Sequence, residues 1–267
     1  MQKETPLANS GVQRLTGKTA LVTGSTRGLG RTTAEWLARE GATVVVNGRD
    51  DGETQKVVSA LRDLGAQSFG IAADLSMVAD AHRLAAETLR QVERLDILIN
   101  NAGMSFMEPF LDVTDEHWEY QTNVNYRSPF ILCQHAARHM IDAGIRGRIV
   151  NFSTIGAHGC HAQGAVYDAA KGAVETMTRN LSFELGPHGI SVNCVVPGAI
   201  AERPGADGDT PAWQRYAGNN IPLGRVGRAE DIAATVLFFC LPESEFITGQ
   251  SLLVDGGHRG WLPESTA

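Results

Sequence analysis

Residues Thr19–Gly30 read TALVTGSTRGLG, an apolar run that passes through a glycine-rich turn into a helical pattern. The run Thr19–Thr23 predicts a buried strand, and Gly28–Glu40 predicts a helix that Gly41 ends. Glycines between a strand and a helix let the backbone approach a phosphate closely, and the helix N-terminus favours its negative charge. The spacing is GxxxGxG rather than GxGxxG, so the stretch indicates either a cradle for a dinucleotide or an ordinary glycine-rich turn.

The same alternation of apolar runs and helical patterns continues along the chain. Most of the apolar runs are continuous, which indicates strands buried on both faces, as in a parallel sheet covered by helices. Repeated strand–helix units predict an α/β fold with a doubly wound parallel sheet of about seven strands and helices on both faces. The expected strands are 19–23, 43–47, 67–72, 95–100, 148–153, 191–196 and 251–254. The expected helices are 28–40, 53–64, 77–92, 115–143, 165–185 and 229–241.

Composition and charge exclude several classes of protein. Of 267 residues, 29 are glycine, 43% are hydrophobic and 20% are charged, and the net charge is −7. This acidic balance without a basic cluster argues against binding to nucleic acid. No apolar run approaches the ~18 residues of a membrane span, and the first residues lack the apolar segment of a secretion signal. We therefore expect a cytoplasmic protein whose four cysteines are buried and reduced.

No linker or internal repeat divides the sequence. We expect a flexible polar tail over residues 1–13 and a single domain over residues 14–267. Residues 201–220 are rich in Gly, Pro and Asp, and we expect there a loop or lid beside a substrate site.

Four motifs, in this order, resemble the short-chain dehydrogenase/reductase family: TGxxxGxG at 23–30, NNAG at 100–103, YxxxK at 167–171 and Pro-Gly at 197–198. The resemblance covers nearly the whole chain. It implies a Rossmann-like domain, a nicotinamide cofactor, a small carbonyl or alcohol substrate, and assembly as a homotetramer or homodimer. The cofactor contacts that it implies are Gly24, Thr26, Gly28, Leu29, Gly30, Asp74, Leu75, Asn101, Ala102, Gly103, Tyr167, Lys171, Pro197, Gly198 and Ile200.

Tyr167 and Lys171 are four residues apart on an expected helix, so they share one face. Hydride transfer to a carbonyl needs a proton donor, and the reverse reaction needs a base. A free tyrosine has a pKa of about 10, and a neighbouring ammonium favours its phenolate. The pair therefore suits general acid–base catalysis, and the resemblance implies that Lys171 also binds the nicotinamide ribose. A tyrosine and a lysine exposed on a helix surface are the alternative.

A hydroxyl and an amide complete the catalytic set that the resemblance implies. The family places a serine 13 residues before the tyrosine, and Thr154 stands there. Ser153 precedes it, and because neighbours on a strand face opposite ways, we expect only Thr154 to hold the substrate oxygen. Asn123 fits the fourth family position, where it would hold a water that links Lys171 to solvent. Asn125 competes for this role, and either asparagine alternatively satisfies backbone groups at a helix kink.

The end of the second expected strand bears on which nicotinamide cofactor binds. Enzymes that prefer NAD carry an acid there for the ribose 2′-hydroxyl, whereas this position holds Gly48, followed by Arg49. Arg27 lies in the glycine turn, and two guanidiniums suit a 2′-phosphate. We therefore predict cofactor contacts from Arg27 and Arg49 and a preference for NADP(H) over NAD(H). Asp50 or Asp51 folding back to the ribose is the alternative, which would favour NAD.

Several further residues have types that suit a site. His158, Cys160 and His161 follow the strand that carries Thr154, but no second ligand pair has zinc-finger spacing. We predict no metal site, and the three residues form either the rim of the substrate pocket or a plain loop. His135 and His139 are four apart on a helix, where a surface or subunit interface is the expected role.

The irregular segment holds three more candidates. Trp213 and Tyr216 either cover the substrate or anchor the segment to the core. Glu202 stands where the family often has a threonine, five residues after Pro197, so the usual hydrogen bond to the cofactor is not expected.

Together these patterns favour an NAD(P)-dependent oxidoreductase that interconverts a ketone or aldehyde and an alcohol. A sugar or polyol, a cyclic alcohol, or a 3-oxoacyl thioester would be its substrate. A catalytically silent nucleotide-binding or sensor protein of the same fold is the alternative. A sugar epimerase or dehydratase of the longer related family is disfavoured, because the chain has no room for a C-terminal substrate domain.

Overall fold

A computed structural model describes residues 13–201 and 210–258. Seven strands form one sheet in the order β3-β2-β1-β4-β5-β6-β9, and every neighbouring pair is parallel. The predicted doubly wound parallel sheet is therefore confirmed. The strands are β1 (Thr19–Val22), β2 (Thr43–Gly48), β3 (Ser68–Ala72), β4 (Ile97–Asn100), β5 (Arg148–Phe152), β6 (Ser191–Pro197) and β9 (Ser251–Val254).

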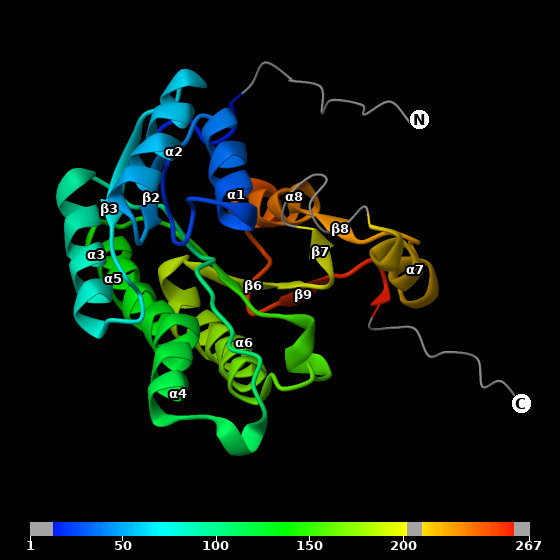
Figure 1. Cartoon of the computed structure of the whole chain (residues 1–267). Coiled ribbons are helices and arrows are strands. Elements are labelled where there is room, and N and C mark those ends of the chain that lie inside the picture. The colour runs from blue at the N-terminus through cyan, green and yellow to red at the C-terminus, as the bar shows by residue number, and fades with distance from the viewer. Residues whose placement is uncertain (1–12, 202–209, 259–267) are drawn as a thin grey trace, which may run out of the picture.

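Helices cover both faces of the sheet, as Figure 1 shows. Side chains alternate across each strand, so Ala20 and Val22 pack toward one layer and Leu21 toward the other. The first layer is made by α1 (Gly28–Arg39), α2 (Asp51–Asp63) and α8 (Ala229–Cys240). The second is made by α3 (Val78–Gln91), α5 (Ser128–Asp142) and α6 (Ala165–Leu185).

The strand order reverses between β1 and β4, and in such sheets a binding crevice is expected at the carboxyl ends of these two strands. The chain passes from β1 outward to β2 and β3, and then crosses back to β4 on the other side of β1. Val22 pairs with Val46 of β2 and with Ile99 of β4. Helices on the two sides of this reversal diverge from the sheet, and ligands of such sheets bind in the gap. The glycine turn follows β1, and the NNAG motif ends β4.

The helix expected over 115–143 is interrupted. It begins as α4 (Asp115–Thr122), widens into a π-helical segment over Asn123–Arg127, and continues as α5. Pro129 has no N–H to donate to the carbonyl of Asn125, four residues earlier, which removes one α-helical hydrogen bond where the helix widens.

The stretch expected to be an irregular loop holds a helix instead. Residues of α7 (Pro211–Asn220) are helical, and the Thr210 hydroxyl accepts the Trp213 N–H at the N-terminus. A threonine N-cap followed by proline is a standard start signal. Two short strands, β7 (Ile200–Ala201) and β8 (Gly227–Arg228), join this segment to the body. Glu202, like the tail before residue 13, lies outside the described residues.

Short helical turns complete the described structure. Single turns of 3-10 helix are η1 (Phe110–Asp112), η3 (Ile155–His158), η4 (Gly186–His188) and η5 (Pro242–Ser244).

The cysteines differ from expectation at one position. The four cysteines are free, and Cys133, Cys194 and Cys240 are buried as expected, but Cys160 is exposed because it lies in the loop after η3.

Candidate active site

The turn after β1 has the geometry of a phosphate cradle. Gly24 and Gly28 have φ values of +60° and +55°, which favour glycine. A Cβ on Gly30 would overlap the Gly24 carbonyl and the Asn101 amide, so α1 begins directly against the turn. The side chain of Arg27, the N-cap, caps no N–H among the described residues, and the first turn of α1 has no acidic side chain. These N–H groups suit an anion such as a pyrophosphate.

Asn101 holds the cradle to the end of β4. Its side-chain nitrogen donates to the carbonyls of Thr23 at 2.9 Å and Gly24 at 3.1 Å. In return, the Thr23 hydroxyl accepts the backbone N–H groups of Asn101 and Ala102, both at 3.0 Å. The NNAG motif therefore fixes the shape of the glycine turn, in addition to lying beside the expected cofactor.

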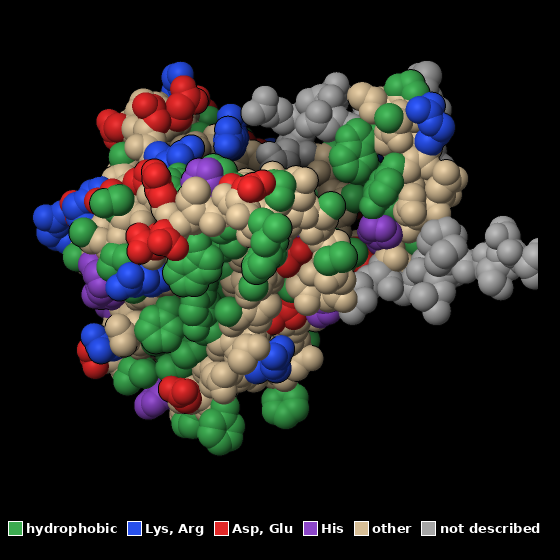
Figure 2. All heavy atoms as spheres, turned by 60° about the horizontal axis from the view of Figure 1, so that its bottom comes forward, with side chains coloured by type: hydrophobic (Ala, Val, Ile, Leu, Met, Phe, Trp, Pro, Cys, Tyr) green, Lys and Arg blue, Asp and Glu red, His purple; other side chains and the backbone are tan. Residues whose placement is uncertain are grey.

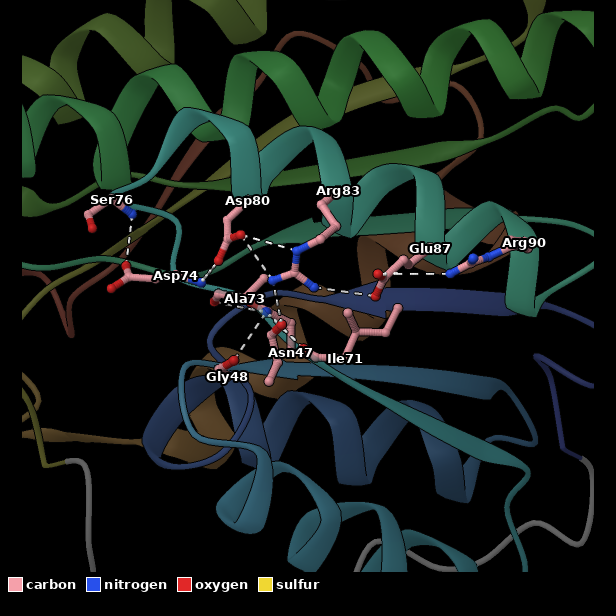
Figure 3. A network of polar contacts seen from close by, with 11 residues as sticks. Asn47, Gly48, Ile71, Ala73, Asp74, Ser76, Asp80, Arg83, Glu87 and Arg90 are labelled. Atoms are coloured by element: carbon pink, nitrogen blue, oxygen red, sulfur yellow. Dashed lines mark hydrogen bonds and ion pairs between the residues drawn. The ribbon is translucent and has the colours of Figure 1, made fainter.

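A network of polar contacts fixes the carboxyl ends of β2 and β3 (Figure 3). The Asn47 side chain donates to two carbonyls at the end of β3, at 3.1 and 3.4 Å. Asp74 donates its N–H to Asp80 at 2.8 Å and accepts the Ser76 N–H at 3.0 Å. The Asp74 N–H, followed by Arg83, lowers the pKa of Asp80 below its ordinary value. Asp74, an expected cofactor contact, is thus held in place by the Asp80 carboxylate and the Ser76 N–H.

Gly48 lies where an acidic residue would favour NAD. A Cβ there would overlap the Thr26 methyl group and lie 2.9 Å from the Thr54 hydroxyl, so the position has no room for a larger side chain in this arrangement. Asp50 does not fold back, because its carboxylate accepts the Glu53 N–H at 2.8 Å as the N-cap of α2. Asp51, the other acid considered, accepts the Gln55 side-chain amide at 3.3 Å, so both carboxylates are engaged within α2.

The two arginines near this end are differently placed. Arg49 donates from Nη1 to the Tyr120 hydroxyl at 2.9 Å, and Arg27 is exposed at the start of α1. Both residues are therefore at the surface, Arg27 directly before α1 and Arg49 directly after β2.

Tyr167 and Lys171 share the face of α6 that is turned toward β5. Lys171 is 2% exposed, and its Nζ lies 5.9 Å from the centroid of the Tyr167 ring. The ammonium donates to the Phe152 carbonyl at 3.0 Å. Burial lowers its pKa from 10.5 to about 8, because removal from water disfavours the charged form. A cation is thus held beside the phenol ring inside the protein.

Thr154 and Ser153 face different partners at the end of β5. The Ser153 hydroxyl donates to Glu175 at 2.6 Å, and His158 Nε2 lies 3.0 Å from both oxygens of the same carboxylate. Thr154 is buried, and its hydroxyl oxygen accepts the Gly156 N–H at 3.4 Å. Among the described residues the Thr154 hydroxyl donates to no acceptor, so its proton is available to a substrate oxygen.

The structure brings Asn125, rather than Asn123, to the lysine. The Asn123 side chain donates to the Ser76 carbonyl at 3.0 Å. Asn125 is fully buried in the π-helical segment, and its Oδ1 would lie 3.3 Å from a Cβ on Gly103, while Lys171 Nζ would lie 3.4 Å from the same point. Asn125 and Lys171 therefore both lie beside Gly103 of the NNAG motif. The Asn125 side chain also binds backbone groups, since it accepts the Met104 N–H at 3.1 Å and donates to the carbonyls of Met104 and Gln121 at 2.6 and 2.8 Å.

Comparison with known proteins agrees with this geometry. A family model described as enoyl-(acyl carrier protein) reductase matches residues 24–259. The short-chain reductase protein NovJ of Streptomyces niveus is 38% identical over 246 residues, which cover 89% of this chain and 92% of NovJ. The chain is a short-chain dehydrogenase/reductase. It is accordingly an NAD(P)-dependent oxidoreductase that acts on CH–OH groups.

Two further relatives of this dehydrogenase/reductase carry more specific names. Sorbitol dehydrogenase of Cereibacter sphaeroides is 34% identical over 259 residues, covering 93% of this chain and 99% of the relative. A gluconate 5-dehydrogenase from Burkholderia cenocepacia, solved in complex with NADP and tartrate, superposes with a TM-score of 0.86 at 31% identity. That match covers 94% of this chain and 98% of the gluconate dehydrogenase.

The two histidines four residues apart on α5, His135 and His139, contact other parts of the protein. His139 accepts the Leu95 N–H at 3.2 Å, and His135 lies 3.0 Å from His82 on the surface. Burial, followed by His82, lowers the pKa of His135. Within the described stretches no group of three or more His, Cys, Asp or Glu side chains is placed to hold a metal ion.

The Pro-Gly motif at 197–198 lies at the end of β6. Pro197 ends β6, and the Gly198 N–H donates to the Val254 carbonyl at 3.1 Å. Ile200 pairs with Gly227 in the small sheet.

The two aromatic residues of α7 contact each other and the segment after β9. Trp213 and Tyr216 are in edge contact, and the Tyr216 hydroxyl lies 3.2 Å from His258. The pair is therefore anchored within the protein, and both rings remain 37% exposed.

Two acidic residues of α6 near the proposed site were not predicted from the sequence. Glu175 is 6% exposed and binds Ser153 and His158, and Asp168 binds His161. The available signal for Glu175 was its position one turn after Lys171, on the buried face of α6 next to Val174. No helix of residues 13–201 and 210–258 is long and apolar enough to cross a membrane.

Proposed function

We propose that this enzyme interconverts a ketone and a secondary alcohol with Tyr167 as general acid and base. The observation that carries the proposal is the buried ammonium of Lys171, 5.9 Å from the Tyr167 ring and at the carboxyl edge of the sheet. A lysine is rarely so deeply buried without an opposite charge, and a strongly perturbed group in such a crevice favours a catalytic role.

Lys171 supplies positive charge where water is excluded. With a pKa of about 8, its side chain remains mostly protonated at neutral pH despite its burial. The Phe152 carbonyl holds the ammonium in place. A cation in this surrounding favours the phenolate over the phenol, so Tyr167 gives up its proton more readily than a free tyrosine.

Thr154 and Tyr167 act together on the substrate oxygen. In reduction, the Thr154 hydroxyl donates a hydrogen bond to the carbonyl oxygen, and Tyr167 donates its proton to the alkoxide that forms. In oxidation, the Tyr167 phenolate takes the hydroxyl proton. A nicotinamide cofactor bound on the glycine turn supplies or accepts the hydride. Asn125, buried beside Gly103, positions a water that returns the proton to solvent through Lys171.

NADP(H) is the proposed cofactor. The absence of room at Gly48 and the capping role of Asp50 leave no acidic group for a ribose 2′-hydroxyl at these positions. Arg27 and Arg49 flank this end of the crevice, and the guanidinium geometry suits a phosphate. The gluconate 5-dehydrogenase relative was solved with NADP, which agrees with the proposal.

The proposed substrate is a small polyhydroxylated compound. Two relatives that this chain covers almost completely are named for sorbitol and gluconate. The crevice also carries several polar side chains near Tyr167, among them His161 and Asp168, which suit a substrate with more than one hydroxyl.

Assembly through the α5–α6 face is part of the proposal. A groove there is lined by Phe130, Ile141, Met177 and Leu181, among others. Figure 2 shows apolar side chains gathered on the face that carries α4, α5 and α6. An exposed apolar groove along two long helices suits a second copy of the chain. Sedimentation of the wild type as a dimer or tetramer, and of Phe130→Glu as a smaller species, would support this, with Leu64→Glu, directly after α2, as the control.

A turnover panel tests the function itself. The purified enzyme is assayed with polyols, cyclic alcohols and their ketones, and NADPH and NADH are followed by absorbance. We expect turnover with NADPH favoured at least tenfold in kcat/KM, and Tyr167→Phe should lower kcat by about a hundredfold or more without weakening NADPH binding. Tyr126→Phe, a tyrosine on the α5–α6 groove, serves as the control. NADPH binding without turnover across the panel would favour the silent sensor instead, and a preference for NADH would refute the arginine argument.

A further inference from the structure

The loop between η3 and α6 carries an imidazole that the proposed mechanism leaves unused. His161 Nδ1 lies 2.8 Å from Asp168 Oδ1, and the His161 backbone N–H donates to Asp168 Oδ2 at 2.7 Å. The centroid of the His161 ring lies 6.3 Å from that of Tyr167. An aspartate-bound histidine therefore stands beside the tyrosine proposed as acid and base.

Asp168 determines which ring nitrogen of His161 is free. An ionised carboxylate only accepts hydrogen bonds, so Nδ1 carries the proton of the neutral imidazole and Nε2 keeps a lone pair. The side chain of His161 is 38% exposed, whereas that of Asp168 is 13% exposed. Within residues 13–201 and 210–258, Nε2 makes no hydrogen bond, and it is thus an oriented acceptor open to a ligand.

Gly156 places this pair next to Thr154. A Cβ on Gly156 would overlap both Asp168 Oδ1 and His161 Nδ1, so the pair rests directly on the backbone there. The Gly156 N–H donates to the Thr154 hydroxyl oxygen. His161 therefore packs against the residue whose N–H binds Thr154, and its ring lies next to that of Tyr167.

The backbone holds the loop in a strained shape. Gln163 has φ +63°, the single positive value at a non-glycine residue in the described chain. Its carbonyl accepts the Glu108 N–H at 3.1 Å, which ties the loop to the segment after β4. Strained residues of this kind persist where surrounding contacts determine them, and they concentrate at functional sites. The position of His161 is thus set by contacts on both sides of the loop.

We propose that His161 is a specificity residue that accepts a hydrogen bond from a second hydroxyl of the substrate. The hydroxyl lies on the carbon next to the reacting carbon, so the preferred substrates are α-hydroxy ketones and the corresponding vicinal diols. The inference rests on the proposed roles of Tyr167 and Thr154. A substrate without this hydroxyl leaves Nε2 desolvated and unpaired, which disfavours it in the transition state.

A matched pair of ketones tests this role. The wild type, His161→Phe and His161→Gln are assayed with 2-hydroxycyclohexanone and cyclohexanone in the presence of NADPH. We expect the wild type to favour the hydroxyketone by about tenfold or more in kcat/KM. His161→Phe should lose this preference through the hydroxyketone alone, and His161→Gln should recover part of it because an amide oxygen accepts a hydrogen bond. His188→Phe, after the far end of α6, is the matched control.

The outcomes separate this inference from the function on which it rests. Equal loss on both ketones in His161→Phe would show that the histidine only anchors the loop, and would overturn the inference. Equal use of the two ketones by the wild type would overturn it as well, while the proposed oxidoreduction would stand. Reduction of neither ketone, nor of any other carbonyl in the panel, would refute the proposed function and the inference together.

Discussion

Replacing Lys171 with methionine should make the protein more stable at neutral pH while it abolishes turnover. The pKa of the buried ammonium falls from 10.5 to about 8 on folding. A difference of about 2.5 in pKa corresponds to about 3 kcal/mol of destabilisation at pH 7. Methionine has a similar length and removes this cost, but the Phe152 carbonyl loses a donor, which costs about 1 kcal/mol. The net gain in the free energy of unfolding is therefore about 2 kcal/mol.

The pH dependence identifies the cause. Between pH 8 and 10.5 the unfolded chain binds the Lys171 proton and the folded chain largely does not, so the stability of the wild type rises with pH in this window. Below pH 8 both states bind the proton and the full penalty applies. The advantage of the methionine variant should thus shrink above pH 8 and reverse by about 1 kcal/mol well above pH 10.5, where both states have lost the proton and only the lost hydrogen bond remains.

Urea unfolding of both proteins without cofactor, at equal chain concentration and at several pH values, measures this difference. Groups that do not interact with Lys171 titrate equally in both chains and cancel. Lys56→Met, which removes an exposed ammonium, is the control and should show no such crossing. A methionine variant that is less stable than the wild type at pH 7, or a difference that does not vary with pH, would refute the reasoning.

Three further predictions follow from the contacts of the site. Thr154→Ala should lower kcat by about a hundredfold or more. Ser153→Ala should keep most activity but lose about 1–3 kcal/mol of stability, because Glu175 loses a buried donor. Turnover and urea unfolding of the two variants test this, and the reverse pattern would show that Ser153 rather than Thr154 binds the substrate oxygen. Asn125→Ala should lower kcat more than Asn123→Ala in the same assay. A larger effect at Asn123 would show that Asn123 holds the fourth family position, as the sequence motif predicts. Gly30→Ala should weaken NADPH binding by at least about tenfold, since its methyl group would displace the cradle that binds phosphate; fluorescence titration measures this, and unchanged affinity would contradict a phosphate site there.

Much of the fold was predictable from local patterns. The central strands are buried on both faces, so their apolar runs stand out. The glycine turn is recognisable because the close approach of backbones at Gly30 admits no side chain. Tyr167 and Lys171 were predictable because a regular helix fixes the phase between them.

Where the backbone is irregular, prediction was weaker. The π-helical segment changes the helical phase between α4 and α5, so spacing alone did not distinguish Asn123 from Asn125. The helix α7 was missed because glycine, proline and aspartate around it outweighed its start signal at Thr210 and Pro211. The pairing of Asp168 with His161 depends on how a loop folds back, which no periodic pattern encodes.

The last strand of the sheet also has a consequence for synthesis of the chain. Cys194 of β6 pairs with Ser251 of β9, 57 residues later. At about 5–20 residues per second, the apolar edge of β6 waits several seconds on the ribosome before its neighbour emerges. An unpaired, buried-type strand edge is a template for association between chains. Because of this strand order, a nascent chain is most exposed to aggregation in the interval before β9 is complete. It is in this interval that the chain most needs a chaperone.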